Sequence, residues 1–272
     1  MPRDPQDELS YADAVAVLRW HADFGVDAVL DDAPHDRFAQ SARETRTTTP
    51  ATAGEPPRAA SPAVAGPAIV TADEAIEAAR ALAASAATLA ALREAIAGFE
   101  GCYLRATATH LVFGAGARDA PLLLTGDIPN AEADLEGAPF LGDEGTLLDN
   151  MLAAIGLNRA AAFLTNVAPW RPPGGSLPLS PLNAAICRIF LDRQIELVRP
   201  RVVVALGGEA AQMALGAKGG ILSARGRWVE FQTPEWTCRA VATLHPAFLL
   251  KSPSHKKLAW ADLRAIRAAL EA

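Results

Sequence analysis

Three polar residues stand just after short apolar runs at widely separated points of the chain. Asp127 follows a run at 122–124, Asn166 follows one at 163–165, and His245 follows one at 240–244. If these runs are neighbouring strands of a parallel sheet, the three side chains meet at its carboxyl edge, where open α/β folds bind ligands. A carboxylate, an amide and an imidazole at one edge predict a site for recognition and catalysis.

The turn around Asp127 is rich in glycine and proline, and it includes Gly126, Ile128, Pro129 and Asn130. Such a turn leaves backbone N–H groups available to a ligand. Phe140 follows in a glycine-flanked loop and offers a flat face on which a base can stack. An ordinary turn with a core phenylalanine fits these residues equally well.

The segment after Asn166 is a proline-rich loop that carries Trp170 and Arg171. A buried asparagine at a strand end presents a donor and an acceptor together, which is the pairing that reads a planar amide edge. Trp170 and Arg171 suit stacking and phosphate contact. The alternative is that Asn166 is a cap or turn residue and that the prolines only end a helix.

Apolar and basic residues follow His245. A histidine at a strand end can donate a hydrogen bond to developing negative charge, and an exposed apolar pair resembles the wedges of proteins that deform DNA. Nearby lysines suit phosphates. The alternative is a core histidine beside a solvated helix. The residues expected to contact DNA here are Leu249, Leu250, Lys251, Lys256 and Lys257.

The segments that position these residues alternate between strand and helix. Strands are expected at about 121–125, 162–167, 201–206 and 238–244, with an antiparallel excursion near 227–231. Helices are expected at about 144–156, 181–198, 208–216 and 256–271. This alternation predicts an α/β fold, a three-layer α/β/α sandwich with a central, mainly parallel sheet of about four strands.

The 272 residues divide into three predicted regions. Residues 1–40 form an N-terminal helical segment, with apolar positions at helical spacing over 9–30. Residues 41–70 read as a flexible linker rich in Pro, Ala and Thr. Residues 71–272 form the α/β/α domain, which opens with a long helix over 73–98 capped by Thr71.

Composition narrows the possible partners and compartment. No apolar run approaches the roughly 18–20 residues of a membrane helix, so no membrane contact is expected. Three scattered cysteines give no disulfide framework, which favours a reducing cytoplasm. The net charge of −6 argues against non-specific coating of nucleic acid, although a local basic face is compatible with it.

The blocks at 126–145, 165–173 and 245–250, supported by stretches at 193–208 and 225–228, resemble the signatures of the uracil-DNA glycosylase superfamily, nearest to family 4. The resemblance covers about residue 99 to the C-terminus. It implies that a monomeric enzyme flips uracil, or a related deaminated base, out of DNA and hydrolyses its N-glycosidic bond.

The resemblance also assigns roles to the residues of these blocks. Phe140 would stack on the base, Asn166 would read its amide edge, and His245 would stabilise the charge on uracil O2. Asp127 would be the second catalytic residue, in a substrate-binding turn with Gly126, Ile128, Pro129 and Asn130. Leu249 and Leu250 would fill the gap left by the flipped nucleotide, with Lys251 near the backbone.

One departure from the family concerns its cofactor. Family 4 enzymes usually hold an iron–sulfur cluster through four cysteines, and the matching positions here are Phe99, Cys102, Trp170 and Cys187. Because a cubane cluster normally needs four ligands, we predict no cluster, no other cofactor and no metal site. The aromatic side chains would fill the vacated volume.

The other departure lies in the catalytic turn. The family's Glu, Ala and second Gly are replaced by Asp127, Ile128 and Asn130, and the last of these adds a side chain where positive φ or a close approach is expected. This leaves two alternatives open: a weakened or covalently trapping relative that binds damaged DNA, or a glycosylase for hypoxanthine or xanthine. Asp134 is either a further carboxylate of the site or a solvated loop residue.

Overall fold

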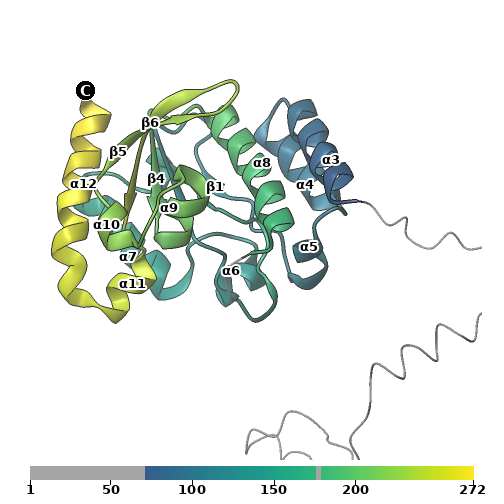
Figure 1. Cartoon of the computed structure of the whole chain (residues 1–272). Coiled ribbons are helices and arrows are strands. Elements are labelled where there is room, and N and C mark those ends of the chain that lie inside the picture. Colours follow the sequence, from purple (N-terminus) through teal and green to yellow (C-terminus); the bar gives the residue numbers. More distant parts are fainter. Residues whose placement is uncertain (1–70, 176–178) are drawn as a thin grey trace, which may run out of the picture. The chain divides into compact units, whose positions relative to one another are not determined.

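A computed structural model describes residues 71–175 and 179–272 (Figure 1). The predicted helical segment at 1–40 and the linker at 41–70 lie outside the described residues. Within the described ranges, no helix combines the length and the apolar character needed to cross a membrane.

A six-stranded sheet in the order β1-β3-β2-β4-β6-β5 forms the centre of the domain. Four neighbouring strands are parallel, and the two edge strands β1 and β5 are antiparallel to their partners. The strands are β1 (Ala115–Gly116), β2 (Leu122–Gly126), β3 (Ala162–Asn166), β4 (Val202–Leu206), β5 (Trp228–Gln232) and β6 (Thr237–Thr243). The predicted α/β fold, its four parallel strands and the antiparallel excursion are confirmed. The edge strand β1 was not predicted, because two residues are too few to show a pattern in the sequence.

Helices cover both faces of the sheet, which makes three layers (Figure 1). Alternate residues of each central strand enter opposite cores. Leu123 and Val203 pack with α3 (Ala72–Ser85), α4 (Leu89–Gly98), α8 (Pro181–Val198) and α9 (Gly208–Leu215). Leu124 and Val204 pack with α7 (Gly142–Ala154) and α12 (Lys256–Glu271). Because both faces are buried, these strands are continuous apolar runs rather than alternating ones.

The long helix predicted at 73–98 is wrong, because two helices occupy this range. They are α3 (Ala72–Ser85) and α4 (Leu89–Gly98). Thr88 starts the second helix by accepting a hydrogen bond from the backbone N–H of Ala91. Thr71 caps α3 as predicted, in a capping box with Glu74.

The remaining helices fall into those that periodicity predicted and those that it did not. Those predicted from periodicity are α7 (Gly142–Ala154), α8 (Pro181–Val198), α9 (Gly208–Leu215) and α12 (Lys256–Glu271). Four shorter helices were not predicted, since each has too few turns for a periodic pattern. They are α5 (Tyr103–Thr107), α6 (Ala131–Glu136), α10 (Ile221–Ala224) and α11 (Pro246–Lys251).

Candidate active site

Asp127, Asn166 and His245 lie at the same edge of the sheet, as expected for residues that follow parallel strands. Asp127 follows β2, Asn166 ends β3, and His245 comes two residues after β6. Gly126 pairs with Asn166 in the strand register. The carboxyl edge of the sheet therefore collects the three residue types from distant points of the chain.

The Asn166 amide has a fixed orientation. Its Nδ2 donates a hydrogen bond to the backbone carbonyl of Asp127 at 2.8 Å, and this acceptor assigns the amide nitrogen to that side. Asn166 is 6% exposed, and its Oδ1 is buried with no hydrogen-bond partner among the described residues. A buried acceptor without a partner costs free energy, so this oxygen is poised to receive a donor from a ligand.

His245 is held as a neutral hydrogen-bond donor. It is the N-cap of α11, and its Nδ1 accepts from the backbone N–H of Ala247 at 3.2 Å. Burial lowers the pKa of His245 to about 4, so the ring is neutral at physiological pH. Since Nδ1 accepts, the single ring proton of the neutral form is on Nε2, which is left free to donate.

Phe140 forms an aromatic wall of the site. Its ring lies 5.8 Å from that of His245 at an interplanar angle of 29°, and it is 3% exposed. The backbone of Phe140 adopts φ 54°, a left-handed conformation that is unfavourable for this residue type. Arg159 holds it there, because Nη2 donates to the Phe140 carbonyl at 2.7 Å.

Gly126 leaves space for the Phe140 ring. A Cβ atom at position 126 would lie 2.5 Å from Cζ of Phe140 and 3.2 Å from Nδ2 of Asn166. These separations are below an ordinary van der Waals contact. Any side chain at this position would displace the aromatic wall and crowd the amide.

The Asp127 carboxylate is bound to the N-terminus of α9. Its Oδ1 accepts from the backbone N–H of Ala210 at 2.7 Å, and Gly207, at φ 109°, leaves room for the carboxylate. Burial raises the pKa of Asp127 to about 6, although the bond from Ala210 opposes the rise. Asp127 therefore orients the Asn166 amide through its backbone carbonyl and contacts α9 through its side chain.

Asn130 has no unusual backbone conformation, so the expectation of positive φ at this position is wrong. It is the N-cap of α6, with φ −74°, and its Oδ1 accepts from Ala133 N at 2.8 Å. Asn130 also lines a cavity of about 260 Å³ with Glu144, Leu250 and Lys251. Burial raises the pKa of Glu144, and a hydrogen bond from the Asn130 side chain opposes this rise.

The apolar pair expected to enter DNA is divided by α11. Leu249 is 1% exposed and belongs to the core, whereas Leu250 is 41% exposed. Lys251, at the end of α11, and Lys256 and Lys257, at the start of α12, are exposed. Of this pair, only Leu250 is exposed at the surface.

Three further predicted positions lie in or beside the loops of the site. Arg171 donates from Nη1 to the Pro129 carbonyl at 2.7 Å, which joins the loops that follow β2 and β3. Ile128 is half-buried against the core. Asp134 is not a solvated loop residue: it is buried and accepts from the backbone N–H and the hydroxyl of Thr109 at 3.0 and 2.7 Å.

Three contributors were not predicted from the sequence: Arg159, Glu144 and the backbone N–H of Ala210. Arg159 reaches a carbonyl 19 residues earlier, and Ala210 bonds a carboxylate 83 residues away. Contacts between residues so far apart in the chain leave no pattern in the local sequence. For Glu144, the one available signal is its position two residues after the glycine that ends the Phe140 loop.

The four positions that match the cluster ligands of family 4 do not fit such a group. Phe99, Cys102, Trp170 and Cys187 are all buried in one core cluster. Phe190 lies edge-to-face with Phe99 at 5.4 Å and with Trp170 at 6.2 Å, so aromatic rings occupy this volume. Throughout the described ranges, no group of three or more His, Cys, Asp or Glu side chains is placed to hold a metal ion.

Comparison with known proteins identifies the family. Residues 113–264 match the Uracil DNA glycosylase superfamily. The type-4 uracil-DNA glycosylase of Archaeoglobus fulgidus is 35% identical over 169 residues, which cover 61% of this chain and 84% of that protein. The type-4 enzyme of Thermotoga maritima is 34% identical over 156 residues, which cover 57% of this chain and 79% of that protein. The type-4 enzyme of Sulfurisphaera tokodaii is 32% identical over 185 residues, which cover 66% of this chain and 84% of that protein. The resemblance seen in the three sequence blocks is confirmed, and the chain belongs to the uracil-DNA glycosylase superfamily.

Proposed function

We propose that this protein removes uracil from DNA by hydrolysing the N-glycosidic bond and leaving an abasic site. The observation that carries the proposal is the complementarity between Asn166 and His245. Uracil carries an N3–H donor that suits the partnerless Oδ1 of Asn166, and its O2 suits the Nε2–H of His245. Cytosine has no proton on N3, so it would leave the Asn166 oxygen unpaired.

The reaction places charge where these groups lie. The C1′–N1 bond breaks with its electron pair leaving on uracil, so negative charge develops on O2 while the sugar becomes cationic. The neutral His245 donor stabilises the O2 charge, and the ionised Asp127 stabilises the cationic sugar. Water then bonds to C1′ and gives up a proton to solvent, and the uracil anion takes up a proton, so the products are an abasic site and neutral uracil. Phe140 stacks on the base during this step.

The surface beside the site suits a DNA backbone. Leu250 is an exposed apolar side chain that can occupy the space vacated by a flipped nucleotide. Lys251, Lys256 and Lys257 supply positive charge next to it. Arg171 donates one hydrogen bond to the Pro129 carbonyl and keeps further guanidinium N–H donors for a phosphate. We propose that the chain acts in this way as a monomer, in the cytoplasm.

An excision assay tests the proposed function. The full chain is incubated with single- and double-stranded oligonucleotides that carry one uracil, and the release of free base is followed. Parallel substrates carry hypoxanthine or xanthine. Preferential release of uracil supports the proposal. Intact uracil DNA in both forms, excision confined to a purine base, or a protein–DNA complex that survives denaturation would overturn it.

The pKa of Asp127 predicts the pH dependence of excision. Because only the carboxylate stabilises a cationic sugar, activity should rise as the pH increases through about 6, where Asp127 ionises. Asp127→Asn keeps an acceptor for Ala210 but carries no charge, so its rate should be lower and should lack this rise. Single-turnover rates between mildly acidic and neutral pH measure the difference. An unchanged profile in Asp127→Asn contradicts the assignment.

A methyl group at position 126 should disturb base stacking. In Gly126→Ala, the new Cβ meets Phe140 and the Asn166 amide, and a displacement of this size in a site costs about 10²-fold in kcat/KM. Gly98→Ala is the matched control, because no heavy atom lies within 4 Å of its Cβ position. Equal excision by both variants would show that the Phe140 ring is not positioned by Gly126.

We further propose that the enzyme works without an iron–sulfur cluster. The proposal is supported by Phe99 and Trp170, which replace two sulfur ligands and pack against Phe190, and by Cys102, whose Sγ contacts Asn183 Oδ1 at 3.5 Å. Protein purified without oxygen should show no visible absorption band and little iron. The double variant Phe99→Cys, Trp170→Cys, reconstituted with iron and sulfide, is the positive control. A brown wild-type sample with about four irons per chain contradicts the proposal.

A further inference from the structure

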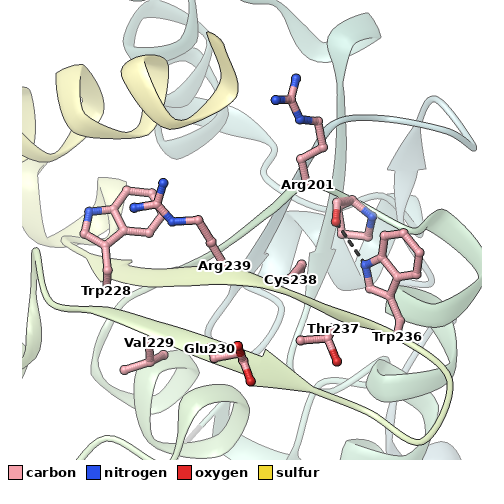
Figure 2. A pocket seen from close by; sticks show the side chains of 9 residues that line it. Arg201, Trp228, Val229, Glu230, Trp236, Thr237, Cys238 and Arg239 are labelled. Carbon is pink, nitrogen blue, oxygen red and sulfur yellow. Dashed lines mark hydrogen bonds between the residues drawn. The ribbon is translucent and has the colours of Figure 1, made fainter. Parts of the chain in front are cut away.

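A cavity of about 500 Å³, shown in Figure 2, lies at the amino ends of β4 and β6. Its walls come from the residues that precede β4, from the start of β6 and from β5. Since β4 and β6 are parallel, their amino ends are a full strand length from the edge that carries the site. A nucleotide at His245 therefore does not reach this cavity.

Two arginines give the cavity positive charge. The guanidinium carbon of Arg239 lies 4.4 Å from the ring centre of Trp228, a cation–π contact that restrains it (Figure 2). Arg201 donates from Nη1 to the Leu270 carbonyl at 2.8 Å, at the end of α12. In the part of the chain that the structure describes, neither arginine forms an ion pair. Both guanidinium groups therefore keep N–H donors for a ligand.

The rest of the wall is largely apolar. Trp236 is fixed by its Nε1, which donates to the Pro200 carbonyl at 3.0 Å, and Val229 is 42% exposed. Burial raises the pKa of the Cys238 thiol to about 11, so it is neutral at physiological pH. Glu230 is the one carboxylate among the lining residues. An occupant with both acidic and apolar groups matches this surface.

The cavity opens beside a free sheet edge. β5 is the last strand in the sheet order, and among the described residues it pairs only with β6. Its outer edge carries backbone donors and acceptors that an extended chain can bind by adding a strand.

We propose that this cavity and the outer edge of β5 bind an extended, acidic peptide segment of a partner protein. The peptide backbone pairs with β5, its carboxylates bind Arg201 and Arg239, and a bulky apolar side chain rests against Trp236. Paired hydrogen bonds from a guanidinium to a carboxylate supply both strength and register. The enzyme would thereby be recruited through a surface that leaves the DNA-binding side open.

Single-stranded nucleic acid fits this surface less well. Bases stack on open aromatic faces, but Trp228 lies between the core and Arg239, and Arg199 lies 5.7 Å from the ring centre of Trp236. The aromatic rings thus act mainly to hold arginines and to provide an apolar wall.

The test uses the full chain and a fluorescein-labelled peptide in which aspartate alternates with valine and phenylalanine. Fluorescence anisotropy should show saturable binding that weakens about tenfold or more in Arg239→Gln and in Arg201→Gln, because each loses charge-assisted hydrogen bonds. Arg118→Gln, an exposed arginine near the other edge of the sheet, should bind like wild type. Hydrogen exchange of the β5 amides should slow when the peptide binds.

Several results would overturn the proposal. These are equal peptide affinity in wild type, Arg201→Gln and Arg239→Gln; equal binding of a peptide with lysine in place of aspartate; and tighter binding of oligodeoxythymidylate that Arg239→Gln abolishes. Concentration-dependent dimerisation that protects β5, without peptide binding, would show that a second copy covers this edge. Uracil excision is measured on the same samples and should be unchanged in both cavity variants, so the proposed function is tested separately.

Discussion

His245→Ala should lower the single-turnover rate of uracil excision by about 10²–10³-fold, which is the usual cost of removing one preorganised donor from a developing anion. The effect should be on the chemical step, because Nε2–H meets a charge that exists only as the bond breaks. Single-turnover kinetics with excess enzyme separate this step from product release.

His110→Ala is a control variant, since His110 is exposed and its Nδ1 contacts the backbone carbonyl of Asp134 at 3.1 Å rather than Asp127, Asn166 or His245. It should excise uracil at the wild-type rate. His245→Gln, which keeps an N–H donor, should recover part of the loss. A His245→Ala enzyme within a factor of a few of wild type would falsify the role of His245.

The same histidine predicts a stability effect with a definite sign. Burial lowers the pKa of His245 from 6.5 to about 4, so the unfolded chain binds more protons than the native one between these values. The contribution of His245 to the free energy of unfolding should therefore increase as the pH rises through that window and be complete above it. Urea titrations of wild type and His245→Ala should diverge over this range.

Asn166→Ala should reduce kcat/KM for uracil excision by roughly 10²-fold, because it removes the acceptor for N3–H and frees the Asp127 carbonyl. Unlike the loss at His245, part of this loss should appear in substrate binding. Asn150→Ala, an exposed asparagine on α7, is the matched control and should behave like wild type. Full activity of Asn166→Ala would show that the partnerless Oδ1 does not read the base.

The placement of Asp127, Asn166 and His245 could be predicted because it depends on local patterns and one rule of topology. Each apolar run is long enough to be read as a strand, and the ends of parallel strands share an edge. The helices α7, α8, α9 and α12 followed from periodicity for the same reason, whereas the single helix predicted at 73–98 is two helices. These features depend on residues that are close in sequence.

The tuning of the site could not be predicted, because it depends on contacts between distant segments. The φ of Phe140 is supported by Arg159, and the Asp127 carboxylate is bonded by Ala210. Leu249 is buried and Leu250 is exposed because the short helix α11 turns adjacent side chains toward different surroundings. None of these contacts is visible in the residue types alone.

The burial of Leu249 has a consequence for how quickly lesions are found. Because Leu249 anchors α11 in the core, Leu250 is presented on a preformed helix rather than on a chain that must first become ordered. No segment around Leu250 then has to fold when the protein tests a base pair. We expect the dwell time at each undamaged site to be set by the opening of the base pair itself, so that DNA mechanics would limit the speed of the search.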